Sequence, residues 1–189
     1  MWDKLIAYGK GPGALYIDLN ADGFPVTREE AKKLYYDYCS SFEPAVKWLR
    51  ARGREASETF VLTNMNGRKR KWFYVDRTNK EKYPNGVEDP KYKGTIAAIE
   101  REGGNFMIQS VNADMTKYAM ILIRNYARKH GIRTGFVNQV YDEIVTETHK
   151  DDSEAFVVIK RRLMIEAAHH WLKKIPMEVE GHVDLCWTK

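Results

Sequence analysis

The sequence predicts an α+β fold in which several helices cover one side of a small antiparallel sheet. Four segments carry apolar residues at helical spacing: 27–52, 92–102, 112–130 and 152–174. Two segments, 59–75 and 132–148, alternate apolar and polar residues around a turn and are typical of β-hairpins. A third alternating stretch, 177–187, predicts a final strand. Helices that flank and separate hairpins in this order indicate the α+β class.

Composition limits the classes of protein. A chain of 189 residues with 43% hydrophobic content is long enough for one domain, or one domain with a small appendage. The net charge of +5 favours an anionic partner such as nucleic acid. Cys39 and Cys186 lie far apart, which argues against a disulfide framework and for a reducing compartment. No apolar run approaches the roughly 20 residues that span a bilayer, so we expect no membrane partner.

The first elements follow from glycines and a helix cap. The stretch YGKGPG, residues 8–13, should interrupt any helix and let the backbone approach a ligand closely. It lacks the Lys-Ser/Thr ending and the preceding strand of a phosphate-binding loop, which excludes that class of nucleotide hydrolase. Thr27 and Glu30 form a capping-box pattern that begins a helix running to about Arg52. Pro44 should bend or break this helix.

The middle of the chain predicts a hairpin, a loop and two helices. Asn66-Gly67 is a strong hairpin signal within 59–75. Charged residues with Pro and Gly over 76–91 indicate a loop. Two helices follow, separated near Gly103-Gly104, which weakens a helix there, and the second ends at Gly131.

The second hairpin places two adjacent carboxylates, Asp142 and Glu143, at or beside its turn. Two carboxylates at a tight turn repel each other unless a cation lies near them. A hard cation such as Mg²⁺ is bound by one or two carboxylates together with substrate phosphates. The alternative is a solvated turn, in which Asp is ordinary. The spacing alone leaves both interpretations open.

Two further groups of polar residues are candidate DNA contacts. The basic run Arg68 to Lys71, followed by Trp72, suits a phosphate backbone, although a solvated hairpin tip explains it equally well. Arg101, Asn105 and Gln109 are spaced four apart, so on a helix they share one face and can donate hydrogen bonds to a minor groove. The alternative for this group is an exposed polar face.

The order of these motifs is more specific than any one of them. Reading YG, TREEAKKLYYDY, NGRKR, RxxxNxxxQ, VYDE and MEVEGHVDLCW along the chain, the sequence resembles the C-terminal part of family A DNA polymerases. This family includes the bacterial DNA polymerase I and phage replicase types. The most specific pieces are NADMTKYAM and NQVYDEIV, which look like the family's conserved helix and its motif C hairpin. The resemblance covers essentially the whole chain and implies a palm-like sheet with incomplete palm and fingers.

The resemblance implies a role for each candidate at the hairpin tip. Asp142 corresponds to the palm carboxylate that binds the two catalytic Mg²⁺ ions, and Glu143 is its accessory neighbour. Tyr141 stands where the family usually has His, a residue that lies against the primer end. Because Tyr can donate a hydrogen bond but carries no positive charge, we expect altered primer contact rather than loss of catalysis.

The remaining candidates are implied to contact DNA or the nucleotide. Arg101, Asn105 and Gln109 match the family's face against the primer–template minor groove. Arg68 and Arg70 match a basic hairpin segment of the palm–thumb side. Tyr8-Gly9 match the end of the fingers helix, where Tyr stacks near the templating base and the incoming nucleotide. On this basis residues 1–26 are the end of the fingers helix with a Gly-rich loop, and 27–189 form one palm and fingers unit.

The departures from the family pattern predict an incomplete active site. Motif A, with the other metal-binding Asp, should precede Tyr8 and is absent, as are the fingers Arg and Lys that grip the triphosphate. Two-metal phosphoryl transfer needs carboxylates on both sides of the metal pair. We therefore expect no polymerisation by the isolated chain.

A split polymerase would explain these departures, with Met1 as a true start, and a truncated remnant is the alternative. Partners are then primer–template DNA, deoxynucleoside triphosphates and a second polypeptide carrying motif A, the thumb and most of the fingers. The expected location is the cytoplasm of a bacterial or phage-infected cell.

Two other function classes remain open from the sequence. One is a non-catalytic basic module that binds double-stranded DNA through the Arg68–Lys71 run and the Arg101 face. The other is an α+β protein of unrelated purpose, in which Asp142 only caps a turn.

Overall fold

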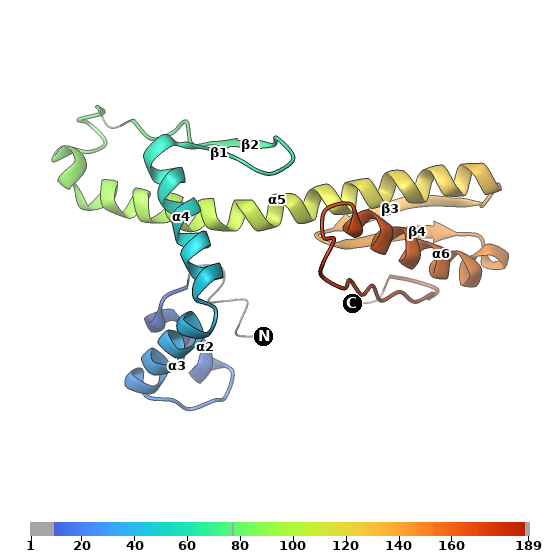
Figure 1. The fold of residues 1–189 in the computed structure, drawn as a ribbon, viewed down its shortest axis with the longest axis horizontal. Helices are drawn as coiled ribbons and strands as arrows, with labels where there is room; N and C mark the ends of the chain where they lie inside the picture. The colour runs from blue at the N-terminus through green and yellow to red at the C-terminus, as the bar shows by residue number, and fades with distance from the viewer. Residues whose placement is uncertain (1–9, 77, 188–189) are drawn as a thin grey trace. The chain divides into compact units, whose positions relative to one another are not determined.

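The computed structural model describes residues 10–76 and 78–187, and the α+β class is confirmed (Figure 1). The chain divides into two compact units, residues 1–109 and 110–189. The elements are α2 (Pro12–Ala21), α3 (Arg28–Ser41), α4 (Glu43–Thr59), β1 (Val61–Thr63), β2 (Lys69–Lys71), the short 3₁₀ helix η1 (Gly86–Glu88), α5 (Pro90–His130), β3 (Thr134–Val140), β4 (Glu143–Thr148) and α6 (Lys150–His169). The strands form two separate two-stranded antiparallel sheets, β1–β2 and β3–β4.

Helix α2 was not expected from the sequence, which suggested only an interruption. Pro12 lies in the first turn, where its missing N–H and fixed φ suit a helix start, so Gly11-Pro12 begins a helix here. Leu15 and Leu19 of α2 and Ala31 of α3 are almost fully buried against one another. The chain turns after α2, with Gly23 at a φ of 83°.

The predicted helix start and break are both confirmed. The Glu30 N–H donates to Thr27 Oγ1 at 3.2 Å, and the Thr27 N–H donates to Glu30 Oε2 at 2.7 Å. The Thr27 N–H and the Thr27 hydroxyl both donate to the Glu30 carboxylate, and these two bonds hold the pKa of Glu30 below its usual value. The helix breaks at Phe42, and Pro44 occupies the first turn of α4. The predicted end near Arg52 was wrong, because α4 continues to Thr59 and stops at Phe60, which has a left-handed φ of 55°.

Helix α5 is continuous through Gly103-Gly104, so the predicted separation into two helices was wrong. A Cβ on Gly103 would lie 2.5 Å from Ala56 Cβ of α4. A Cβ on Gly53 of α4 would lie 2.5 Å from the Glu100 carbonyl oxygen of α5. These glycines are required by the close approach of two helices, and tertiary packing offsets their cost of about 1 kcal/mol each in a helix.

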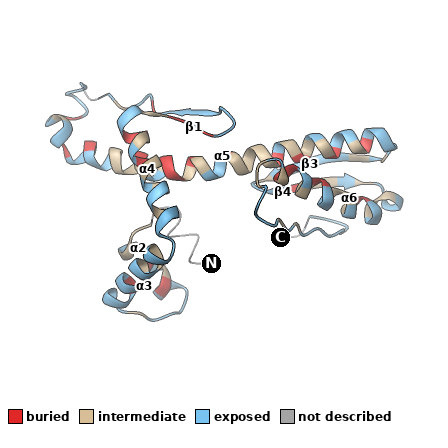
Figure 2. Ribbon diagram, in the orientation of Figure 1, coloured by how far each residue is buried: buried red, intermediate tan, exposed pale blue. Residues whose placement is uncertain are grey.

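The core of the first unit lies where α4, α5 and the first hairpin meet (Figure 2). Leu62 of β1 and Trp72, which follows β2, pack with Ile99 and Phe106 of α5. The turn predicted at Asn66-Gly67 is confirmed, with Gly67 at a φ of 81°. Segment 76–91 was predicted as a loop. Among its described residues, the only regular secondary structure is the 3₁₀ helix η1 and the first residues of α5.

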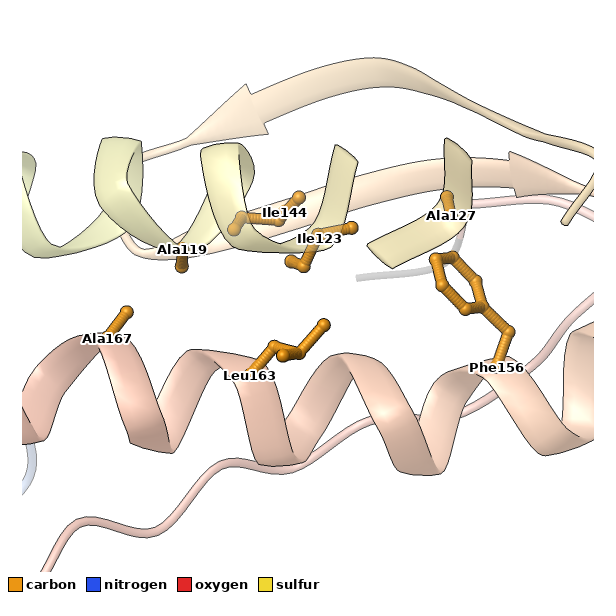
Figure 3. Close-up of a cluster of buried hydrophobic side chains, with 7 residues drawn as sticks. All are labelled: Ala119, Ile123, Ala127, Ile144, Phe156, Leu163 and Ala167. Atoms are coloured by element: carbon orange, nitrogen blue, oxygen red, sulfur yellow. The ribbon is translucent and has the colours of Figure 1, made fainter. Parts of the chain in front are cut away.

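The core of the second unit joins α5, β4 and α6 (Figure 3). Ile144 of β4 points into the layer between the two helices, where Leu163 and Phe156 of α6 meet Ile123 of α5. Alanines on both helices complete this layer: Ala119, Ala127 and Ala167. Figure 3 shows these side chains facing one another across the helices, which fixes the hairpin to both of them.

The final strand predicted over 177–187 was wrong, because this segment has no regular secondary structure. The Arg161 Nε–H of α6 donates to the Val179 carbonyl at 2.7 Å, and Gly181 lies against Val157 and Arg161. The segment therefore follows α6 through side chains instead of joining a sheet. Within the described part of the chain, no helix is both long and apolar enough to cross a membrane.

Candidate active site

The tip of the β3–β4 hairpin holds the predicted carboxylates. Val140 pairs with Glu143, so Tyr141 and Asp142 alone form the turn. Tyr141 has a φ of 54°, which a non-glycine residue rarely adopts, and its side chain is 87% exposed. Gln139 Nε2 donates to the Tyr141 carbonyl at 3.1 Å and supports this turn. The prediction that Asp142 and Glu143 lie at the turn is confirmed.

The two carboxylates have different surroundings. Asp142 is exposed, and its side chain has no hydrogen-bond or ion-pair partner among residues 10–76 and 78–187. Glu143 is also exposed, but its Oε1 accepts a hydrogen bond from Trp187 Nε1 at 2.8 Å. The Asp142 carboxylate therefore has no protein partner among the described residues, whereas one oxygen of the Glu143 carboxylate accepts from Trp187.

A half-buried lysine lies under this hairpin. Lys160 Nζ of α6 donates to the Ile144 carbonyl at 2.8 Å and to Thr146 Oγ1 at 3.1 Å. Burial lowers the pKa of Lys160, and the nearby Glu143 charge opposes this shift. Lys160 thus fixes β4 to α6 and places a positive charge near the Glu143 carboxylate.

The chemistry of the tip fits a hard divalent cation in part. Both carboxylates supply oxygen, the ligand that Mg²⁺ prefers, and Asp142 is exposed. No cluster of three or more His, Cys, Asp and Glu side chains suited to a metal occurs among the described residues. Mg²⁺ often takes only one or two protein carboxylates and completes its shell with water and substrate phosphates, so the residues present fit one side of such a site.

Arg101, Asn105 and Gln109 lie in the first unit, in the part of α5 that contains the two glycines. Because α5 is continuous there, the three side chains share one face, as predicted. Arg101 and Gln109 are exposed and Asn105 is half-buried. Arg101 and Asn105 line an open hollow of about 500 Å³ beside Lys10 and Gly11 at the start of α2.

The basic hairpin is partly neutralised from within its own unit. Arg70 Nη2 donates to Glu102 Oε2 at 2.5 Å, and the buried Trp72 Nε1 donates to the same oxygen at 2.8 Å. The Arg70 guanidinium also lies over the Trp72 ring, 5.2 Å from its centre. The Arg68 N–H donates to Asn64 Oδ1 at 2.9 Å within the turn. Lys69 and Lys71 remain exposed beside them.

The remaining predicted site residues, Tyr8 and Gly9, lie outside the described residues.

Comparison with known proteins decides the family. Residues 4–189 match the model of DNA polymerase family A. The chain belongs to this family. The resemblance drawn from the sequence motifs is therefore confirmed.

Among related polymerases, DNA polymerase I of Aquifex aeolicus is 39% identical over 85 residues, 45% of this chain and 15% of that protein. DNA polymerase I of Geobacillus stearothermophilus is 25% identical over 182 residues, 96% of this chain and 18% of that protein. The DNA polymerase of Bacillus phage SP01 is 24% identical over 147 residues, 78% of this chain and 14% of that protein. The matched part of this chain thus corresponds to less than a fifth of the length of each of these relatives.

A solved structure has the same fold over most of the chain. The POL domain of Pol1 from M. smegmatis, in complex with DNA primer-template and dNTP, superposes with a TM-score of 0.67 at 25% identity. The match covers 87% of this chain and 26% of that one. This chain of family A therefore has the fold of a section of a DNA polymerase domain.

Sequence reasoning missed residues that surround the candidates, among them Lys160, Glu102 and Trp187. Lys160 lies four residues after Phe156 and three before Leu163, so it falls on the apolar face of α6. A charged residue on that face indicates from the sequence alone that Lys160 has a special contact. Glu102 and Trp187 gave no such signal, because their partners Arg70 and Glu143 lie 32 and 44 residues away in the sequence.

Proposed function

We propose that this chain supplies the motif C hairpin and part of the primer–template surface for template-directed addition of deoxynucleotides to DNA. The observation that carries the proposal is the exposed Asp142 carboxylate at a two-residue turn, beside Glu143, in a member of family A. The relative from M. smegmatis was solved with DNA primer-template and dNTP, which supports the same ligands for this chain.

In this proposal Asp142 is the metal ligand, and Glu143 adds a second negative charge to the tip. When bound, Mg²⁺ stabilises charge on the attacking and leaving oxygens of phosphoryl transfer. We assign to Tyr141 a hydrogen bond to a phosphate at the primer end, which its exposed side chain supports. The positive charge of Lys160 offsets part of the negative charge of Glu143.

The basic residues of the first unit hold DNA in this proposal. Lys69 and Lys71 contact phosphates, while Arg70 stays on Glu102 and orients the hairpin. Arg101, Asn105 and Gln109 face the primer–template minor groove, where donors read base edges and hold the duplex in place. Position and charge supply most of the catalysis in phosphoryl transfer, so these contacts serve the reaction directly.

The second metal-binding carboxylate, of motif A, comes in our proposal from a separate polypeptide that also brings the thumb and most of the fingers. Two-metal transfer needs carboxylates on both sides of the metal pair, and this hairpin supplies one side. We therefore expect no polymerisation by the 189-residue chain alone, and primer extension when such a polypeptide is added.

The decisive experiment is Asp142→Ala in the combined preparation, assayed by primer extension with Mg²⁺. We expect a loss of about a thousandfold, because metal-ion stabilisation is worth several kcal/mol. The matched control is Asp37→Ala, which removes an exposed carboxylate from α3 and should leave extension unchanged. Equal extension by Asp142→Ala and the unaltered chain would reject the proposal.

A second candidate is a non-catalytic module that binds double-stranded DNA, favoured by the exposed Lys69 and Lys71 and the net charge of +5. The same variant separates the two. Asp142→Ala should keep duplex affinity in the catalytic case while extension is lost. A pure binding module shows no extension with any added polypeptide and no uptake of Mn²⁺ at the hairpin.

A further inference from the structure

The contact between Trp187 and Glu143 joins the last described residue to the hairpin tip. Trp187 Nε1 donates to Glu143 Oε1 at 2.8 Å across 44 residues of sequence. The indole N–H can only donate, so Trp187 is the donor and Glu143 the acceptor. Because the acceptor is a carboxylate, the hydrogen bond is charge-assisted. Trp187 is half exposed, so burial of its ring alone does not explain the position.

Residues 177–187, here called the C-terminal strap, are fixed to α6 before they reach the tip. Arg161 Nε donates to the Val179 carbonyl at 2.7 Å. Gly181 lies so close to α6 that a Cβ there would be 3.0 Å from Val157 Cγ2 and 3.2 Å from Arg161 Cγ. The same helix holds β4 through Lys160. The strap and the hairpin therefore share one support, α6.

We infer that the C-terminal strap positions Glu143 for cation binding at the hairpin tip, with Trp187 as the positioning residue. This inference rests on the proposed function, because it assigns a purpose to Glu143 beside a metal-binding Asp142. A free glutamate samples several rotamers on an exposed strand, and a donor on Oε1 selects those that keep the carboxylate near the turn. Oε2 then stays open to the cation or to its bound water.

Residues 177–187 form no strand, although apolar and polar residues alternate there. The segment runs from α6 to the hairpin tip, because Arg161 holds Val179 and Glu143 holds Trp187. The apolar and polar alternation of the segment is thus not a sheet signal in these 189 residues.

The first test observes the contact itself by NMR on the full chain with ¹⁵N-labelled tryptophan. The indole N–H signal that disappears in Trp187→Phe is the signal of Trp187. Glu143→Ala should shift this signal and speed its hydrogen exchange, because the acceptor is gone. The matched control is Glu147→Ala, an exposed carboxylate on the same strand, which should leave it unchanged. An unshifted signal in Glu143→Ala would overturn the inference.

The second test measures Mn²⁺ affinity by electron paramagnetic resonance, with Mn²⁺ alone as the probe. Trp187→Phe keeps an aromatic ring and removes only the donor, and it should weaken Mn²⁺ binding about tenfold, as expected for a lost charge-assisted hydrogen bond. Trp48→Phe, at a similarly exposed tryptophan of α4, is the control and should bind as the unaltered chain does. Arg161→Met should weaken binding in the same direction as Trp187→Phe, by loosening the strap.

The outcomes separate the inference from the proposed function. Equal Mn²⁺ affinity in Trp187→Phe, with binding lost in Asp142→Ala, rejects the strap and keeps the metal role of the tip. Mn²⁺ binding that is undisturbed by Asp142→Ala rejects the metal role and the inference together. A weakened affinity in Trp187→Phe and Arg161→Met, with a shifted indole signal in Glu143→Ala, supports both.

Discussion

The two hairpins of this chain differ in charge and in how their tips are built. The β1–β2 tip is basic, and its turn is held by the buried Asn64, which accepts from the N–H groups of Asn66 and Arg68, and by Gly67 at positive φ. The β3–β4 tip is acidic, and its turn of two residues places a tyrosine at positive φ. The basic turn thus uses residues suited to its backbone, whereas the acidic turn does not.

Compensation of charge also differs between the hairpins. Glu102 accepts from both Arg70 and Trp72, so part of the basic charge is neutralised where the hairpin meets its core. Asp142 has no such partner in the described part of the chain, while its neighbour Glu143 is held by Trp187. Strained turns and uncompensated charges tend to occur where a protein binds something. The comparison therefore directs attention to the acidic tip as the chemical site and to the basic tip as a DNA contact.

The largest expected effect comes from removing the support of the acidic hairpin. Phe156→Ala should lower the free energy of unfolding of the second unit by about 4 kcal/mol, because it deletes a buried ring next to Ile144. Chemical denaturation followed by circular dichroism measures the loss. Hydrogen exchange should rise in β3–β4 and stay unchanged in β1–β2, whose core contains none of these residues. Equal loss of protection in both hairpins would show that they do not stand on separate cores.

The next effect tests the support of the basic hairpin. Gly103→Ala should destabilise the first unit by about 2 kcal/mol, because its Cβ would lie 2.5 Å from Ala56 Cβ and 3.2 Å from Leu62 Cδ1 of β1. Gly94→Ala on the same helix is the matched control, since nothing lies within 4 Å of the added methyl group. The control should be neutral or stabilising by up to about 1 kcal/mol. Thermal unfolding of both variants measures the difference, and equal behaviour would contradict the close helix crossing.

A smaller effect sharpens the assignment of DNA contact to the basic tip. The double variant Lys69→Gln and Lys71→Gln should weaken duplex binding and reduce the slope of log affinity against log salt by about 2, one unit per lost phosphate contact. Fluorescence anisotropy over a salt series gives this slope. The charge-matched control is Lys173→Gln with Lys174→Gln, in the turn region after α6. An unchanged slope in the first double variant would assign the basic tip to a solvated surface.

The smallest effect concerns the base of the acidic hairpin. Arg133, just before β3, donates from Nε to Asp152 Oδ2 at 3.1 Å, and this bond with a backbone N–H lowers the pKa of Asp152. Because the folded pKa is below the unfolded one, the unfolded chain binds more protons between the two values. The contribution of Asp152 is thus complete above the ordinary carboxyl pKa and is lost as pH falls through the folded value.

Asp152→Asn should remove this part of the acid sensitivity and leave stability near pH 7 only slightly lower, since the pair is exposed. Circular dichroism during titration from neutral pH to about pH 2 measures it, in the range where carboxyl groups titrate. Glu154→Gln, an exposed carboxylate of the same helix, is the control. An acid transition identical in Asp152→Asn and the unaltered chain would show that the ion pair does not hold the hairpin base.

The sequence by itself determined the features that depend on neighbouring residues. The capping box of Thr27 and Glu30, the helix break beside Pro44, the turn at Asn66-Gly67 and the placement of Asp142 at a hairpin tip were all correct. Each follows from the conformational preferences of two to four consecutive residues. The motif order likewise indicated the family that the comparison with known proteins confirms.

Only the tertiary structure decided the features that depend on distant residues. Gly103 and Gly104 remain helical because α4 approaches α5 there, and 177–187 follows α6 although its pattern predicts a strand. Glu102 on Arg70 and Trp187 on Glu143 were equally invisible, since nothing near either residue in the sequence indicates its partner. The physical reason is that packing and charge pairing act through space and can outweigh local preferences of about 1 kcal/mol per residue.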